Sequence, residues 1–81
     1  MIKERKKLVV SGGGICYYVV HDAENSGAGY GIYAETEGEE GDAQYVRKVF
    51  FTEEEAVLRC RWLCENQVYP VALFDTLRNI F

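Results

Sequence analysis

Long apolar runs, cysteines and basic residues beyond the first few positions are all scarce in this chain of 81 residues. No apolar run approaches the roughly 20 residues that a membrane-spanning helix needs, and the apolar run after the charged start is too short for a signal peptide. The three cysteines, Cys16, Cys60 and Cys64, cannot form a fully paired disulfide framework, which is typical of a reduced protein. The sequence therefore predicts a cytoplasmic protein without a membrane partner.

The charge is unevenly distributed along the chain. Residues 1–7 carry Lys3, Arg5, Lys6 and Lys7 against a single acid, whereas the rest of the chain is acidic and the net charge is −4. An acidic body repels nucleic acid and anionic membranes, so the charge argues against a nucleic-acid partner. We expect the basic start to be a solvated, frayed terminus. The alternative is a basic N-terminal arm that binds nucleic acid.

Alternation of apolar and polar residues predicts three strands, at Ile15–Asp22, Tyr30–Glu37 and Gln44–Phe51. Leu8–Ser11 is a candidate for a fourth strand that pairs with the first across a run of glycines. Loops of about six residues are too short for a parallel crossover, so neighbouring strands are expected to be antiparallel. Both faces of the Ile15–Asp22 strand are apolar, which predicts at least partial cover on each side.

Two amphipathic helices are predicted after the strands. Thr52 and Glu55 have the spacing of a capping box, which marks the start of the first helix. One arc of its helical wheel is expected to face the sheet and holds Ala56, Val57, Cys60, Leu63, Cys64 and Gln67. Pro70 suits the first position of the second helix, whose apolar arc holds Leu73, Phe74, Leu77, Ile80 and Phe81.

The predicted fold class is α+β, in a single domain over residues 1–81. We expect an antiparallel β-meander of three or four strands, followed by two C-terminal helices packed on one face. A chain of this length buries only about 60–65% of its unfolded surface, so its core is small.

Glycine-rich segments do not match phosphate-binding loops. Ser11–Gly14 precedes a strand rather than the Gly-Lys-Ser/Thr and helix of a P-loop. Gly27–Gly31 likewise precedes a strand, so the dinucleotide fingerprint also fails. These glycines are therefore interpreted as turn residues, and no nucleotide cofactor is predicted.

Candidate metal-binding and catalytic residues are few. Cys60 and Cys64 lie one helical turn apart, and Cys16 and His21 are conceivable further ligands. Cys16 and His21 are an odd number of strand positions apart and point to opposite faces, which argues against a shared metal. His21 and Asp22 are adjacent on a strand and also point apart. The sequence predicts no metal, no cofactor and no catalytic residues, with the cysteines packed in the core.

Aromatic and acidic residues offer two further surfaces. The strand tyrosines are interpreted as cross-strand pairs rather than as stacking platforms for nucleic acid, because few cations accompany them. They are Tyr17, Tyr18, Tyr30, Tyr33 and Tyr45. The acidic segment 35–42 lacks the ligand spacing of a calcium loop and is interpreted as a solvated hairpin tip. Its alternative role is an acidic knob for a basic partner.

Leu58 and Trp62 lie on the side of the first helix opposite the arc that faces the sheet. Two explanations are open. In the first, the second helix covers the pair within the chain. In the second, the pair forms the seam of a symmetric homodimer, in which the same patch meets its copy. Tryptophan is enriched among interface anchors and a small chain gains core by association, so Leu58 and Trp62 are the predicted interface residues.

Four short motifs follow one another between residues 15 and 81. They are Tyr17-Tyr18, Tyr30-Gly31-Ile32, Phe51-Thr52 and Asn66-Gln67-Val68-Tyr69-Pro70, the last followed by Leu73. In this order they resemble a family of small uncharacterised proteins from clostridial-type bacteria, a domain of unknown function. The resemblance implies a bacterial protein, and it carries over no catalytic or binding residue.

Three functions are considered, and no reaction constellation is visible in the sequence. The leading hypothesis is a small, non-catalytic interaction or regulatory module that binds an unidentified protein. The second is an enzyme or redox protein that uses Cys16, Cys60 or Cys64. The third is a nucleic-acid-associated protein that uses the basic N-terminal arm.

Overall fold

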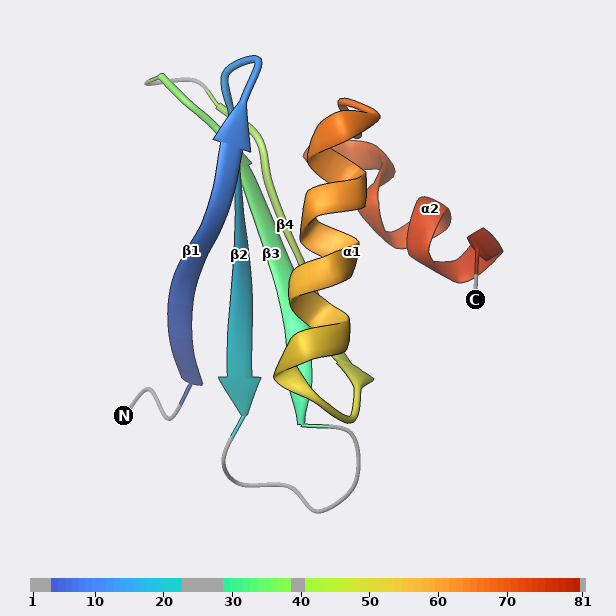
Figure 1. The fold of residues 1–81 in the computed structure, drawn as a ribbon. Coiled ribbons are helices and arrows are strands. Elements are labelled where there is room, and N and C mark those ends of the chain that lie inside the picture. Colours follow the sequence, from blue (N-terminus) through green and yellow to red (C-terminus); the bar gives the residue numbers. More distant parts are fainter. Residues whose placement is uncertain (1–3, 23–28, 39–40, 81) are drawn as a thin grey trace.

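The computed structural model describes residues 4–22, 29–38 and 41–80. Four antiparallel strands form one sheet in the order β1-β2-β3-β4, and two helices joined by a short 3-10 turn follow them (Figure 1). The elements are β1 (Glu4–Gly12), β2 (Ile15–Asp22), β3 (Tyr30–Thr36), β4 (Ala43–Phe50), α1 (Glu53–Glu65), η1 (Pro70–Ala72) and α2 (Leu73–Ile80). The predicted α+β fold is confirmed, and the meander has four strands.

Strand β1 is longer than the sequence predicts. Gly13 and Gly14 have φ angles of 62° and 81°, and this left-handed pair joins β1 to β2 in a two-residue hairpin. The pairing then continues along the whole of β2. Residues 4–7, which we expected in a frayed terminus, therefore belong to the sheet, because their backbone pairs with the second half of β2. Residues 1–3 lie outside the described residues.

The hydrophobic core lies between the sheet and the helices. Both helices lie on the same side of the sheet (Figure 1), and α1 contacts all four strands. Alternate strand residues meet the inward faces of the helices in this core, which consists of Ile15, Tyr17, Val19, Ile32, Ala34, Val46, Phe50, Ala56, Cys60, Leu63, Leu73 and Leu77. The helical periodicity of the sequence thus identified Ala56, Cys60 and Leu63 as buried residues of α1. Gln67 was wrongly placed on the same arc, because α1 ends at Glu65 and Gln67 is exposed.

Helix α1 begins at the predicted capping box. The Thr52 hydroxyl accepts a hydrogen bond from the Glu55 backbone N–H at 3.2 Å. The same hydroxyl lies 3.2 Å from a Glu55 carboxylate oxygen, to which it donates. This cap satisfies one of the backbone amides that a helix start leaves without an internal partner.

Helix α2 begins later than predicted and buries a narrower stripe. Pro70 opens the 3-10 turn η1, and α2 starts at Leu73. Leu73 and Leu77 are buried one turn apart, whereas Phe74, expected on the same arc, is 53% exposed. Phe74 lies about 100° around the helix from Leu73, which is enough to turn its ring out of so shallow a core. The side chains of Ile80 and Phe81, the other two residues predicted on this arc, lie outside the described part of the structure.

Candidate interaction surfaces

The sheet face that points away from both helices carries a row of large side chains. Leu8 on β1 lies opposite Tyr18 on β2. Tyr18 in turn lies opposite Tyr33 on β3, which lies opposite Tyr45 on β4. We call these four residues the tyrosine row. Within the described part of the chain, both helices lie on the other side of the sheet (Figure 1), and Leu8 is 53% exposed.

Two further rows flank the tyrosine row on the same face. On one side, Lys6 of β1 lies opposite Val20 of β2, which lies opposite Gly31 of β3. On the other side, Cys16 of β2 lies opposite Glu35 of β3. The Lys6 cation and the Glu35 acid therefore occupy opposite sides of the tyrosine row.

Cations rest on the faces of the tyrosine rings. The Tyr18 and Tyr33 rings lie with their centroids 5.6 Å apart at an interplanar angle of 56°. The Lys6 ammonium lies 4.7 Å from the Tyr18 centroid and 4.5 Å from that of Tyr33. The Arg47 guanidinium lies 5.9 Å from the Tyr45 centroid. Such cation–π contacts contribute about 0.5–1 kcal/mol each at exposed sites, and they hold the rings in place.

Glu35 links two members of the tyrosine row through their hydroxyls. The Tyr18 hydroxyl donates to one carboxylate oxygen at 2.6 Å, and the Tyr33 hydroxyl donates to the other at 3.3 Å. The hydrogen bond to Glu35 is the main cause that raises the pKa of Tyr18 to about 12, with desolvation second. Desolvation and then Glu35 also raise the pKa of Tyr33. Glu35 is therefore a structural acceptor rather than part of a solvated tip.

We expect Glu35→Ala to lower the pKa of Tyr18 from about 12 toward its ordinary value of 10. Removal of the carboxylate removes both the acceptor and the negative charge that oppose phenolate formation. Absorbance at 295 nm, recorded from pH 8 to 13, should show more tyrosine ionised at pH 11 in the variant. Because the folded state holds this proton more tightly, wild type should lose the associated stability as pH rises from 10 toward 12.

Glu37→Ala is the matched control for this titration. Glu37 is an exposed acid two residues beyond Glu35, and its backbone N–H bonds to the Gly14 carbonyl. Its removal should leave the titration curve of wild type unchanged. If Glu35→Ala also gave the wild-type curve, the Glu35–tyrosine link would be refuted.

The other two strand tyrosines lie on the helix side of the sheet. Tyr17 is fully buried, its hydroxyl donates to the Val68 carbonyl at 2.7 Å, and burial raises its pKa to about 12. Tyr30 stacks on His21, its cross-strand partner, with centroids 4.7 Å apart. Cross-strand pairing is thus confirmed for Tyr30 and within the tyrosine row. Tyr17 instead lies opposite Ala34 and packs in the core, so the five tyrosines do not share one face.

The three cysteines all carry free thiols but lie in different environments. Cys60 is fully buried in the core, and this burial raises its pKa to about 12. Cys64 is partly buried on the same helix. Cys16 alternates with buried neighbours along β2 and therefore points to the opposite face of the sheet, so the prediction that it packs in the core was wrong. Among the described residues, no three potential metal ligands gather at one place.

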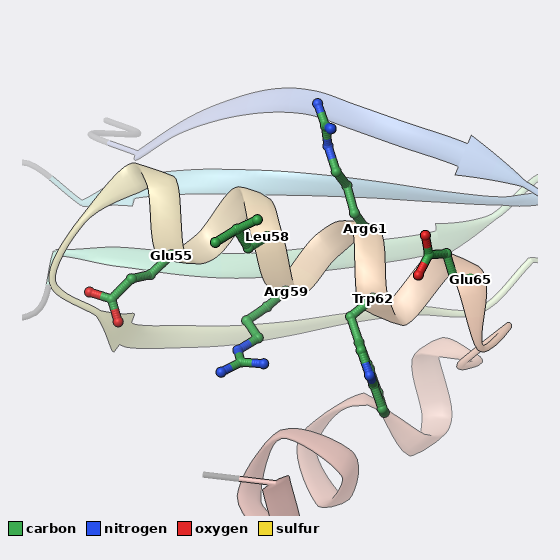
Figure 2. A pocket seen from close by; sticks show the side chains of 6 residues that line it. All are labelled: Glu55, Leu58, Arg59, Arg61, Trp62 and Glu65. Atoms are coloured by element: carbon green, nitrogen blue, oxygen red, sulfur yellow. The ribbon is translucent and has the colours of Figure 1, made fainter.

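Leu58 and Trp62 border an open groove on the outer side of α1. The groove is also lined by charged residues, namely Glu55, Arg59, Arg61 and Glu65. Leu58 is 66% exposed, whereas Trp62 is partly buried and packs against the core. Figure 2 shows Trp62 extending from α1 toward α2. The second helix thus approaches Trp62 but leaves Leu58 open, and the homodimer seam through this pair stays a prediction.

No protein-family model matches this chain, and neither do curated proteins or solved structures. The resemblance to the clostridial-type family therefore stays a prediction. In the segments that the structure describes, no helix is long and apolar enough to cross a membrane.

Proposed function

We propose that this chain is a small, non-catalytic interaction module of the bacterial cytoplasm, which binds protein through the tyrosine row. The observation that carries the proposal is the register that aligns Leu8, Tyr18, Tyr33 and Tyr45 across all four strands on the face away from the helices. Aromatic residues are enriched at protein interfaces because they supply a large contact area from few rotatable bonds. Glu35 and Lys6 already fix two of these rings, which reduces the ordering cost of binding.

The charge of this face favours protein over nucleic acid. A stacking surface for single strands combines ring faces open to bases with cations that track the phosphates. Here the Lys6 ammonium lies over two of the rings, and the Glu35 carboxylate lies at their hydroxyl ends. The net charge of −4 adds a repulsive field.

Two groups that catalysis could use are held in unreactive forms. The pKa of the Cys60 thiol is raised to about 12 by burial, and that of the Tyr18 phenol to about 12 mainly by Glu35. Both groups keep their protons at neutral pH, so neither supplies a thiolate or phenolate nucleophile. The burial of Cys60 argues against it as the reactive thiol of the redox alternative.

Photo-crosslinking at a single position tests the proposal. A photoreactive amino acid in place of Leu8, introduced in the native cells, should give a protein adduct on irradiation, because this side chain lies in the tyrosine row. The same amino acid in place of Glu54, an exposed residue in the first turn of α1, is the control and should give none. An adduct at Leu8 that nuclease removes, or equal adducts at both positions, would overturn the proposal.

A further inference from the structure

The sheet face is large enough for a stable dimer. Its strands are seven to nine residues long. At about 4.8 Å between strands and about 3.3 Å per residue, the face measures roughly 500 Å² in projection. Two such faces in contact bury about 1,000 Å², and the relief of the side chains raises this toward the ~1,200–2,000 Å² of specific interfaces.

Strand β2 has the composition of a strand covered on both sides. Ile15, Tyr17 and Val19 face the helices and are buried, and on the other face Val20 is only 4% exposed while Tyr18 is partly buried. Strands that are apolar on both faces are typical of sheets packed on both sides. The helices in the described part of the chain cover only one side (Figure 1), and Leu8 and part of Tyr18 remain open as apolar surface on the other.

The charges of this face are complementary to those of a second copy. Lys6 and Glu35 lie on opposite sides of the tyrosine row. A two-fold axis along the row, in the plane between two facing sheets, exchanges these sides. It therefore brings Lys6 of each copy to the same end of the interface as the partner's Glu35, two strands further along the row, so that two symmetric pairs of opposite charges attract.

The groove on α1 is a poorer dimer seam. The apolar side chains that line the groove are Leu58 and the exposed part of Trp62, and the other lining residues are charged (Figure 2). An interface core is depleted in charged residues and enriched in aromatic ones. The tyrosine row offers three aromatic rings and a leucine, with Lys6 and Arg47 lying over the rings, whereas the α1 groove offers one aromatic ring among four charged residues.

We infer that the partner of the tyrosine row is a second copy of this chain, packed sheet to sheet about a two-fold axis along the row. This inference rests on the proposed function and names its partner. Each row then meets its own copy, with Leu8 near the partner's Leu8. The face of β2 that the helices leave open becomes the centre of a second hydrophobic layer.

Two exposed leucines provide the first test by sedimentation equilibrium. Wild type should have twice the monomer mass of 9.2 kDa at micromolar concentrations. Leu8→Glu places two like charges together across the axis and should weaken dimerisation by at least about 100-fold. Leu58→Glu, at a similarly exposed leucine on α1, should remain a dimer. A monomeric wild type at high micromolar concentration, or a dimer broken by Leu58→Glu but not by Leu8→Glu, would overturn the inference.

Exchanging the charges of Lys6 and Glu35 tests how the two copies are oriented in the dimer. Recovery of the dimer on mixing the two variants shows that neither variant is misfolded. Lys6→Glu alone brings acids together in its homodimer, and Glu35→Lys alone brings cations together, so each variant should be monomeric. Mixed at equal concentration, the two variants restore both pairs of opposite charges and should form a one-to-one dimer. A mixture that stays monomeric, or single variants that remain dimeric, would overturn the two-fold axis along the row.

These outcomes separate the inference from the proposed function. A monomeric wild type that still gives a Leu8 adduct with a different protein would refute the second copy and leave the interaction module standing. The absence of any protein adduct from Leu8 together with a monomeric wild type would refute both.

Discussion

Leu63→Ala is expected to lower the free energy of unfolding by about 3 kcal/mol. Leu63 is fully buried in the core where α1 meets the sheet. Truncation removes apolar contacts and leaves a cavity that a short helix on a four-stranded sheet can fill only partly. Urea unfolding followed by the fluorescence of Trp62, the single tryptophan, measures the change at a fixed protein concentration.

Leu58→Ala is the matched control, since it makes the same change on the opposite side of the same helix. Leu58 is 66% exposed, so its truncation should cost less than about 0.5 kcal/mol. Equal losses at the two leucines would contradict the placement of α1. A large loss at Leu58 alone would show that this residue is covered in solution.

Gly31→Ala is expected to cost about 3 kcal/mol, at the upper end of overpacking substitutions. A Cβ atom at Gly31 would overlap the Val46 backbone carbonyl and lie 3.1 Å from a Tyr45 ring carbon. The register between β3 and β4 shifts beside Gly31, where β4 comes close. A backbone oxygen cannot move aside as a flexible side-chain end can, so the strands themselves must shift. Thermal and urea unfolding measure the loss.

Gly14→Ala separates overlap from backbone strain. Gly14 has a φ of 81°, but no atom lies within 4 Å of the position that its Cβ would take. Its substitution should therefore cost only the left-handed conformation, about 1 kcal/mol. If Gly14→Ala cost more than Gly31→Ala, the close approach of β4 to Gly31 would be refuted.

The sequence predicted the helices, the strands and the buried side of α1 well, because these depend on the local periodicity of apolar residues. The 3.6-residue spacing of Ala56, Cys60 and Leu63 located the buried side of α1. Alternation did not choose between the two faces of β2, because both are apolar. Thr52 located the start of α1 because capping is a local interaction. The fully buried Cys60 likewise followed from its place on the inward arc.

The candidate site was harder to predict because it depends on register. Alternation places Tyr18, Tyr33 and Tyr45 on some face of their strands, but only the register puts them in one row. That register depends on turn geometry and on irregularities such as the shift between Leu8 and Val10 in β1. One usable signal was present: β2 is apolar on both faces, which predicted at least partial cover on each side, and Val20 on the face away from the helices is 4% exposed.

Residues 4–7 of the basic start were mispredicted for a related reason. Charged residues near a chain end favour fraying by composition alone. Lys6 and its neighbours are nevertheless ordered, since the tight Gly13-Gly14 hairpin aligns them with the far half of β2. Lys6 then gains the two ring faces of Tyr18 and Tyr33 as partners. Long-range pairing of this kind is invisible in a local window of sequence.

The most direct test of the sheet-to-sheet dimer is an isotope-filtered NOESY spectrum of a sample mixed from labelled and unlabelled protein. Only contacts between copies give cross-peaks in such a spectrum. A sheet-to-sheet dimer should give cross-peaks that connect the Leu8 methyls and the ring protons of Tyr18 and Tyr33 with the same groups of the second copy. Cross-peaks confined to Leu58 and Trp62, or none at all at millimolar concentration, would contradict it.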